Sequence, residues 1–141
     1  MKREKGRCEF VGHTAEVALR LTADTPGDLC AEACRALGAL LREEAGFVAA
    51  HRDSVRTVAV DAVDADALLV DLLNELIYLA ETERWAPSEV EDVEWTPTRV
   101  VLRLAGLRLR GAPSRIKSAT HHGLALHRAG GGWEAEVIFD V

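Results

Sequence analysis

Two stretches of the chain repeat apolar residues every three or four positions, which is the spacing of an amphipathic helix. The first covers residues 26–43, where Thr25 is a suitable N-cap and Gly46 a suitable stop. The second covers residues 65–83, is capped by Asp64 and has the broadest apolar face in the chain. At 1.5 Å per residue this second helix is about 28 Å long, so we expect it to be the central packing element.

The other apolar residues alternate with polar ones, as in strands with one buried face. This pattern predicts strands at 7–11, 17–22, 54–61, 89–96, 98–110, 115–128 and 132–140. A kink is expected at Ala105-Gly106, and the glycine run 130–132 predicts a hairpin turn. Because helices and strands are segregated, the expected fold is α+β: one domain over 1–141, with two amphipathic helices packed on a mostly antiparallel β-sheet.

The composition excludes some classes of protein but does not identify a function. The 141 residues are 48% hydrophobic and 28% charged, an ordinary globular mix. A net charge of -6 lacks the field that drives non-specific nucleic-acid binding, so any role with RNA is expected to run through a partner or a local patch. No apolar run is long enough to cross a bilayer, and no secretory signal follows the basic N-terminus.

The chain has three cysteines, Cys8, Cys30 and Cys34. An odd number argues against a paired disulfide framework and fits a reducing cytoplasm. Cys30 and Cys34 lie on one face of the first predicted helix, and we expect both to be small buried core residues.

Carboxylates near the two ends of the chain carry the candidate chemistry. A short polar loop, 12–16, joins two predicted strands and presents Glu16 as a base or as a ligand for a hard cation. Asp140 follows an apolar strand, and Val141 adds a carbonyl or carboxylate oxygen. Ca²⁺ takes about 6–8 oxygens, so waters or partner groups would have to complete a site built on these residues.

A polar stripe on the second predicted helix carries Asp71, Asn74 and Glu75 at the spacing of one helical face. Two interpretations remain open for this stripe. It is either a solvated face or a surface used by a partner protein.

Four segments, in order, resemble the archease family. Residues 10–17, FVGHTAEV, are similar to its N-terminal motif, which usually reads His-Thr-Ala-Asp, and residues 68–79, LLVDLLNELIYL, to its helix signature. Residues 116–124, IKSATHHGL, resemble its strand motif, and residues 133–141 resemble its C-terminal ending. Order, spacing and total length agree over essentially the whole chain.

The resemblance implies a small α+β accessory protein, not an enzyme, that assists RtcB-type RNA ligases in tRNA splicing and RNA repair. Such a protein promotes guanylylation of the ligase and multiple turnover, and RNA is expected to be reached only through the ligase. The resemblance also implies a divalent-cation site, for Ca²⁺ or alternatively Mg²⁺ or Mn²⁺, at Glu16, Asp140 and Val141. Supporting or partner-contact roles are expected for His13, Lys117, His122, Asp71 and Glu75.

The sequence departs from the family pattern at three places. Glu16 replaces the usual Asp, and its extra methylene is easier to absorb in a flexible Ca²⁺ shell than in an octahedral Mg²⁺ shell. His121 replaces a tyrosine, and Gly111-Ala112 stands where the family usually has Gly-Glu, which removes one acidic group.

Two other classes of function stay open. A cation at Glu16 and Asp140 would suit a metal-dependent hydrolase, with His13 or His122 as general base. A general holdase chaperone would instead need an exposed apolar patch.

Overall fold

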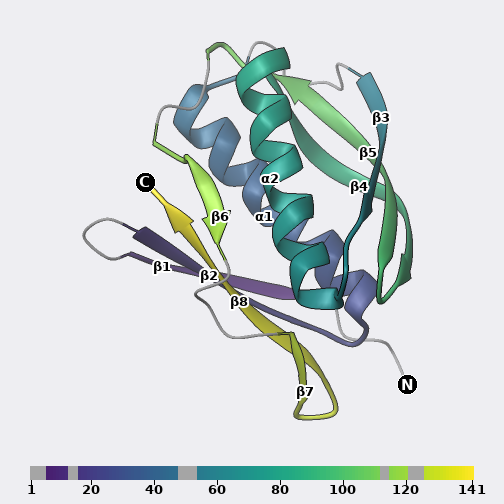
Figure 1. Ribbon diagram of the computed structural model, residues 1–141. Helices are drawn as coiled ribbons and strands as arrows, with labels where there is room; N and C mark the ends of the chain where they lie inside the picture. Colours follow the sequence, from purple (N-terminus) through teal and green to yellow (C-terminus); the bar gives the residue numbers. More distant parts are fainter. Residues whose placement is uncertain (1–5, 13–15, 48–53, 112–114, 121–125) are drawn as a thin grey trace.

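The protein folds as two antiparallel sheets with two helices between them (Figure 1). The computed structural model describes residues 6–12, 16–47, 54–111, 115–120 and 126–141. The elements are β1 (Arg7–Gly12), β2 (Glu16–Ala23), α1 (Pro26–Ala45), β3 (Ser54–Asp61), α2 (Ala65–Glu83), β4 (Trp85–Thr96), β5 (Arg99–Arg108), β6 (Ser118–Thr120), β7 (His127–Ala129) and β8 (Gly132–Asp140). The α+β class is confirmed, and the strands divide between two sheets.

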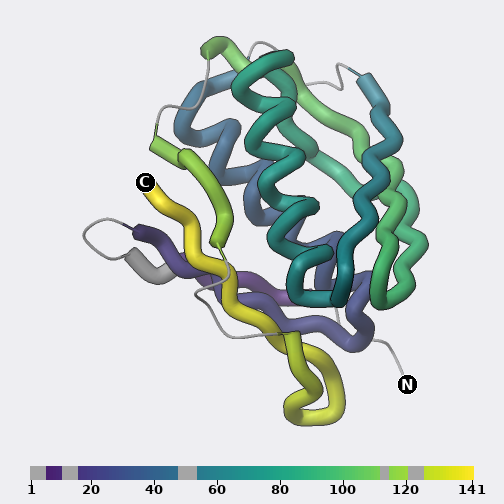
Figure 2. The backbone as a smooth tube through the Cα atoms, viewed as in Figure 1, coloured from purple at the N-terminus to yellow at the C-terminus, as the bar shows by residue number. Residues whose placement is uncertain are grey.

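The larger sheet has the order β1-β2-β8-β6, and β7 also pairs with β8; the smaller sheet has the order β3-β5-β4. Each helix contacts strands of both sheets, as the backbone tube shows (Figure 2). The core therefore lies around the helices and takes side chains from both sheets, among them Leu19, Leu37, Leu72, Leu102 and Phe139, all fully buried. No helix in the described part of the chain is long and apolar enough to cross a membrane.

Both predicted helices and their caps are confirmed. The Thr25 hydroxyl accepts a hydrogen bond from the Asp28 amide at 3.1 Å, and the Asp64 carboxylate accepts one from the Ala67 amide at 2.8 Å. These bonds satisfy donors that the first turn of a helix leaves without a partner. At its other end α1 stops at Gly46, whose φ of 70° favours glycine.

The kink expected at Ala105-Gly106 corresponds to an irregularity in the smaller sheet. This irregularity is a bulge in β4, the strand opposite, which has one more residue than β5 at this point. Ser88 has no register partner between Pro87, opposite Gly106, and Glu89, opposite Ala105. Its hydroxyl donates to the Ala105 carbonyl at 3.2 Å. This bulge explains why β4 begins at Trp85, four residues earlier than the alternation predicts.

The prediction of one strand over 115–128 is wrong. Two short strands, β6 and β7, pair with the same edge of β8. Thr120 lies opposite Ile138 and His127 lies opposite Glu134, so β6 and β7 do not form one continuous ladder with β8. His121 and His122 fall outside the described residues.

At the other end of β8 the predicted hairpin turn is confirmed. Gly130 and Gly131 both have positive φ, 57° and 83°, in a two-residue turn between Ala129 and Gly132.

Candidate functional site

The two carboxylates singled out in the sequence are brought together by the larger sheet. Glu16 is the first residue of β2 and Asp140 the last residue of β8, and the antiparallel register places them directly opposite each other. Opposed residues of such a pair project from the same face, with Cβ atoms about 5 Å apart. Both residues are half-buried.

Strand β6 holds Asp140 from its other side. The Asp140 carbonyl accepts a hydrogen bond from the Lys117 amide at 2.9 Å, and its carboxylate accepts one from the Ser118 hydroxyl at 3.2 Å. Ser118 is also the register partner of Asp140. Sequence reasoning missed Ser118, because its proximity to Asp140 depends on a strand pairing that the local pattern does not reveal.

Some of the other predicted site residues lie near this pair, and others fall outside the described residues. Val141 follows Asp140 and packs, partly buried, against the edge of the core, while the Lys117 side chain is exposed. The end of β8 lies beside the start of β6 and one end of the β1–β2 pair (Figure 1). His13 and His122 fall outside the described residues.

The donors at this position fit part of the shell of a hard divalent cation. Two carboxylates and a hydroxyl are oxygen ligands, and like charges on opposed strand positions repel unless a cation lies between them. Among the residues that the structure describes, no three or more His, Cys, Asp or Glu side chains form a group that could hold a metal ion. Glu16 and Asp140 therefore supply an open, partial site that needs further oxygens.

The polar stripe of α2 contains a structural clamp. The Asn74 amide group donates to the Ala119 carbonyl at 3.0 Å, and its oxygen accepts from the Ala119 amide at 2.8 Å. Eight positions earlier, the Asp66 carboxylate accepts from the Leu126 amide at 2.7 Å. The helix thus holds the chain on both sides of residues 121–125, a role that was not predicted for either residue.

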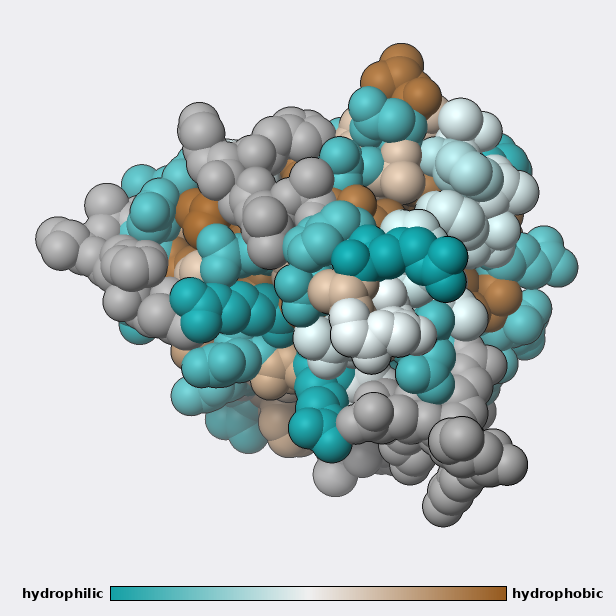
Figure 3. Space-filling model, turned by 90° about the horizontal axis from the view of Figure 1, so that it is seen from below, coloured by the Kyte–Doolittle hydropathy of each residue, from teal (hydrophilic) through white to brown (hydrophobic). Residues whose placement is uncertain are grey.

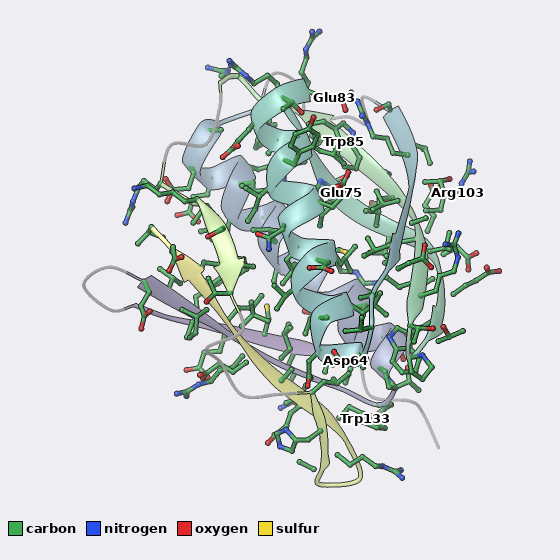
Figure 4. The ribbon with its side chains drawn as sticks, viewed as in Figure 1. Asp64, Glu75, Glu83, Trp85, Arg103 and Trp133 are labelled. Carbon is green, nitrogen blue, oxygen red and sulfur yellow. The ribbon has the colours of Figure 1, made fainter. Side chains whose placement is uncertain are left out.

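Asp71 and Glu75 differ from Asn74 in being exposed, one helical turn apart on α2. Figure 4 shows Glu75 on α2, well separated from the C-terminal end of β8. The structure therefore does not bring Glu75 to the Glu16–Asp140 pair. A partner-contact role for these two residues stays a prediction.

The cysteines behave as the sequence predicts. All three are free; Cys30 and Cys34 are buried in α1 and Cys8 is exposed. Burial raises the pKa of Cys30 from its ordinary value of 9.0 to about 12, and burial raises the pKa of Cys34 as well. Both remain neutral thiols near neutral pH, unsuited to ligating a metal.

The exposed large hydrophobic residues of the described chain do not favour a general holdase. Phe10, Phe47, Val63 and Tyr78 come from four separate segments. Hydrophilic residues cover much of the face seen in Figure 3, with only small hydrophobic areas between them. Neither observation gives the broad apolar surface that binding of unfolded clients requires.

Comparison with known proteins gives one consistent family. A family model, the Archease protein family (MTH1598/TM1083), matches residues 8–141. Protein archease of Methanopyrus kandleri is 29% identical over 94% of this chain and 98% of its own, and protein archease of Methanosarcina mazei is 25% identical over 94% of each.

Two solved structures share the fold. Methanobacterium thermoautotrophicum protein 1598 has a TM-score of 0.69 at 18% identity, covering 95% of this chain and 98% of that one. A Thermotoga maritima protein described as an archease, possible chaperone, has a TM-score of 0.62 at 23% identity, covering 93% and 94%. The fold and the sequence motifs therefore point the same way.

Proposed function

This chain belongs to the archease family, and from that membership we propose that it is an accessory protein that activates an RtcB-type RNA ligase in tRNA splicing or RNA repair. It promotes guanylylation of the ligase and multiple turnover, and it has no active site of its own. Its free cysteines suit the reducing cytoplasm, where we expect it to work.

One observation carries this proposal, the placement of Glu16 directly opposite Asp140 at the end of β8. With Val141, these residues would hold a divalent cation, which when bound supplies a concentrated positive charge at the surface that meets the ligase. Ca²⁺ is the expected ion, because its flexible shell accommodates the longer Glu16 side chain; Mg²⁺ and Mn²⁺ are the alternatives. Ser118 orients the Asp140 carboxylate through its hydroxyl.

The overall charge also suits this partner. A net charge of -6 complements a ligase whose nucleotide pocket binds the phosphates of GTP, and complementary charge speeds the encounter of two proteins.

The test mixes the protein, in substoichiometric amount, with the RtcB-type ligase of the same organism. Covalent guanylyl-ligase and RNA joining beyond one turnover are measured for wild type, Glu16→Gln and Asp140→Asn. Both substitutions remove one charge at nearly constant shape. The matched control is Glu136→Gln, which removes a carboxylate from the same strand, where it pairs with Arg20 at 2.8 Å.

We expect stimulation by wild type and by Glu136→Gln, and its loss in the two site variants. A folded wild type that fails to stimulate an active ligase contradicts the proposal. If the isolated protein has phosphatase activity and Asp140→Asn abolishes it, the metal-dependent hydrolase becomes the better proposal.

A further inference from the structure

Positive charge is distributed very unevenly along this acidic chain. Residues 97–133 contain seven of the 17 Lys and Arg residues and none of the 23 Asp and Glu residues. The rest of the chain is therefore strongly acidic. Three of these seven residues, Arg99, Arg103 and Arg115, form ion pairs with carboxylates from other parts of the chain. The local field that attracts a polyanion is therefore set by the cations without such a partner among the described residues.

Part of this positive charge gathers where α1 and α2 end. The Leu109 amide donates to the Arg84 carbonyl at 2.7 Å, and Leu109 also forms a bridge with Phe47. The Arg110 amide donates to the Gly46 carbonyl at 3.0 Å. Three segments distant in the sequence are thus joined through their backbones, and they present what we call the arginine patch: Phe47, Arg84, Arg108 and Arg110.

The residues of the patch are exposed, and they lie on segments that backbone hydrogen bonds hold together. Arg110 donates from Nε to the Phe47 carbonyl at 3.2 Å. A Cβ on Gly111 would lie 4.0 Å from Nη1 of Arg84, so the Arg84 guanidinium lies beside the segment that carries Arg110. All three arginines are exposed, and Phe47 is 41% exposed. Figure 4 shows nitrogen-tipped side chains projecting at this end of the molecule, near Glu83.

Within the described chain, Arg84 and Arg108 lack the ion pair with a carboxylate that several other arginines form. Arg99 and Arg103 form ion pairs with Asp61 and Glu91. No carboxylate among the described residues pairs with Arg84 or Arg108, and the nearby Glu83 is already paired with Arg56 at 2.8 Å. The patch therefore retains its charge for an external anion.

The backbone of Arg84 adds a second, independent observation. Arg84 caps α2 with φ 53° and ψ 44°, and it is the only non-glycine residue with positive φ in the described chain. Glycine is the usual residue at such a cap, because a side chain strains the left-handed conformation. Local strain kept at an exposed charged residue is typical of a position retained for binding.

We propose that the arginine patch binds single-stranded nucleic acid. Guanidinium groups match phosphate oxygens in charge and geometry, and an exposed aromatic ring beside them offers a base a surface on which to stack. The three arginines would hold successive phosphates, and Phe47 one base. This inference does not depend on the ligase, and it departs from the expectation that RNA is reached only through that partner.

The experiment measures fluorescence anisotropy of labelled oligouridylate of about 12 nucleotides between about 50 and about 200 mM salt. The patch triple variant is Arg84→Gln, Arg108→Gln and Arg110→Gln. Its matched control is Arg99→Gln, Arg103→Gln and Arg128→Gln, which removes the same charge outside the patch. Both variants change the net charge from -6 to -9, so total charge is held constant between them.

We expect wild type and the control variant to bind with a slope of log affinity against log salt near about -2, from three phosphates at about 0.7 each. The patch variant should lose at least about tenfold in affinity, and most of this slope. Phe47→Ala should weaken binding by about 5- to 100-fold and leave the slope unchanged. Thermal unfolding confirms that each variant is folded.

Three results would overturn the proposal. One is no binding by folded wild type at the lowest salt, and another is equal loss of affinity in the two triple variants. The third is binding of a poly-glutamate peptide as tight as that of oligouridylate, with no effect of Phe47→Ala, which would assign the patch to an acidic protein instead.

Discussion

At the scale of single residues, the opposed carboxylates Glu16 and Asp140 have a thermodynamic signature that does not require the ligase. Ca²⁺ at ten times its Kd should stabilise the fold by about 1.4 kcal/mol, which raises the Tm of a chain of this size by about 5 °C. Glu16→Gln should raise the Tm of the metal-free protein slightly, because it removes a repulsion, and abolish the rise with Ca²⁺. Differential scanning calorimetry with and without a chelator measures both effects.

Glu136→Gln is again the control and should keep the full response to Ca²⁺. A wild-type Tm that does not change with Ca²⁺, Mg²⁺ or Mn²⁺ contradicts a cation site on these residues. So does a shift of the same size in Glu16→Gln.

Cys30 predicts how stability changes at alkaline pH. Its pKa is about 12 in the folded protein and 9.0 ordinarily, so the unfolded chain releases this proton first. The stabilising contribution is fully present below pH 9.0 and is lost as pH rises toward about 12, with a limiting slope of about 1.4 kcal/mol per pH unit. Cys34 acts in the same direction.

Urea unfolding between about pH 8 and about pH 10.5 checks this prediction. Cys30→Ala should be less stable at pH 8, because it leaves a cavity, but its stability should fall less steeply with pH. Parallel pH profiles for Cys30→Ala and wild type would show that the thiol does not contribute.

At the scale of elements, the sequence predicts those helices and strands that are determined by interactions within a single segment. The helices are predicted well, because their caps and the spacing of their apolar residues lie within each segment. The strand predicted over 115–128 fails, because hydrogen bonds from α2 hold the chain on both sides of residues 121–125. An Asn within a leucine-rich helix was the available signal, since Asn has low helix propensity and has to be retained for another reason.

The Asn74 clamp on β6 gives the first prediction at this scale. Asn74→Ala removes both partners of a buried residue, Ala119, and should destabilise the protein by about 2 to 3 kcal/mol. Glu75→Ala, one position along and exposed, should change stability by less than about 0.5 kcal/mol. Urea unfolding compares the two variants, and equal effects would show that the clamp adds nothing to stability.

The contact between α1 and β4 gives the second prediction at the scale of elements. A Cβ on Gly38 would lie 2.1 Å from the Pro87 carbonyl oxygen, so an alanine there forces the helix away from the strand. Gly38→Ala should cost about 2 kcal/mol or more, although alanine is the better helix former. Arg35→Ala, exposed on the same helix, is the control, and a stabilised Gly38→Ala would contradict this packing.

At the scale of the whole molecule, the sequence and the structure contribute different parts of the function. The motif identified Glu16 and Asp140, and the sheet register explains how residues near opposite ends of the chain meet. The arginine patch was not predicted, because net charge conceals a local excess and because its three segments meet only through tertiary hydrogen bonds. The division of the strands between two sheets was not predicted either, because the local pattern of apolar and polar residues does not specify which strands pair.

The two candidate sites stand on different elements, and this predicts that they act independently. The acidic pair is built on β2, β6 and β8, and the arginine patch on the ends of the helices and of β5. Changes at separate sites without shared partners add, so Glu16→Gln should retain oligouridylate affinity and the patch triple variant should retain the Tm rise with Ca²⁺. Anisotropy titrations with and without Ca²⁺ measure any coupling directly. A change in nucleic-acid affinity on adding Ca²⁺ that disappears in Glu16→Gln would contradict independence, because linkage then requires nucleic acid to change the affinity for the cation by the same factor.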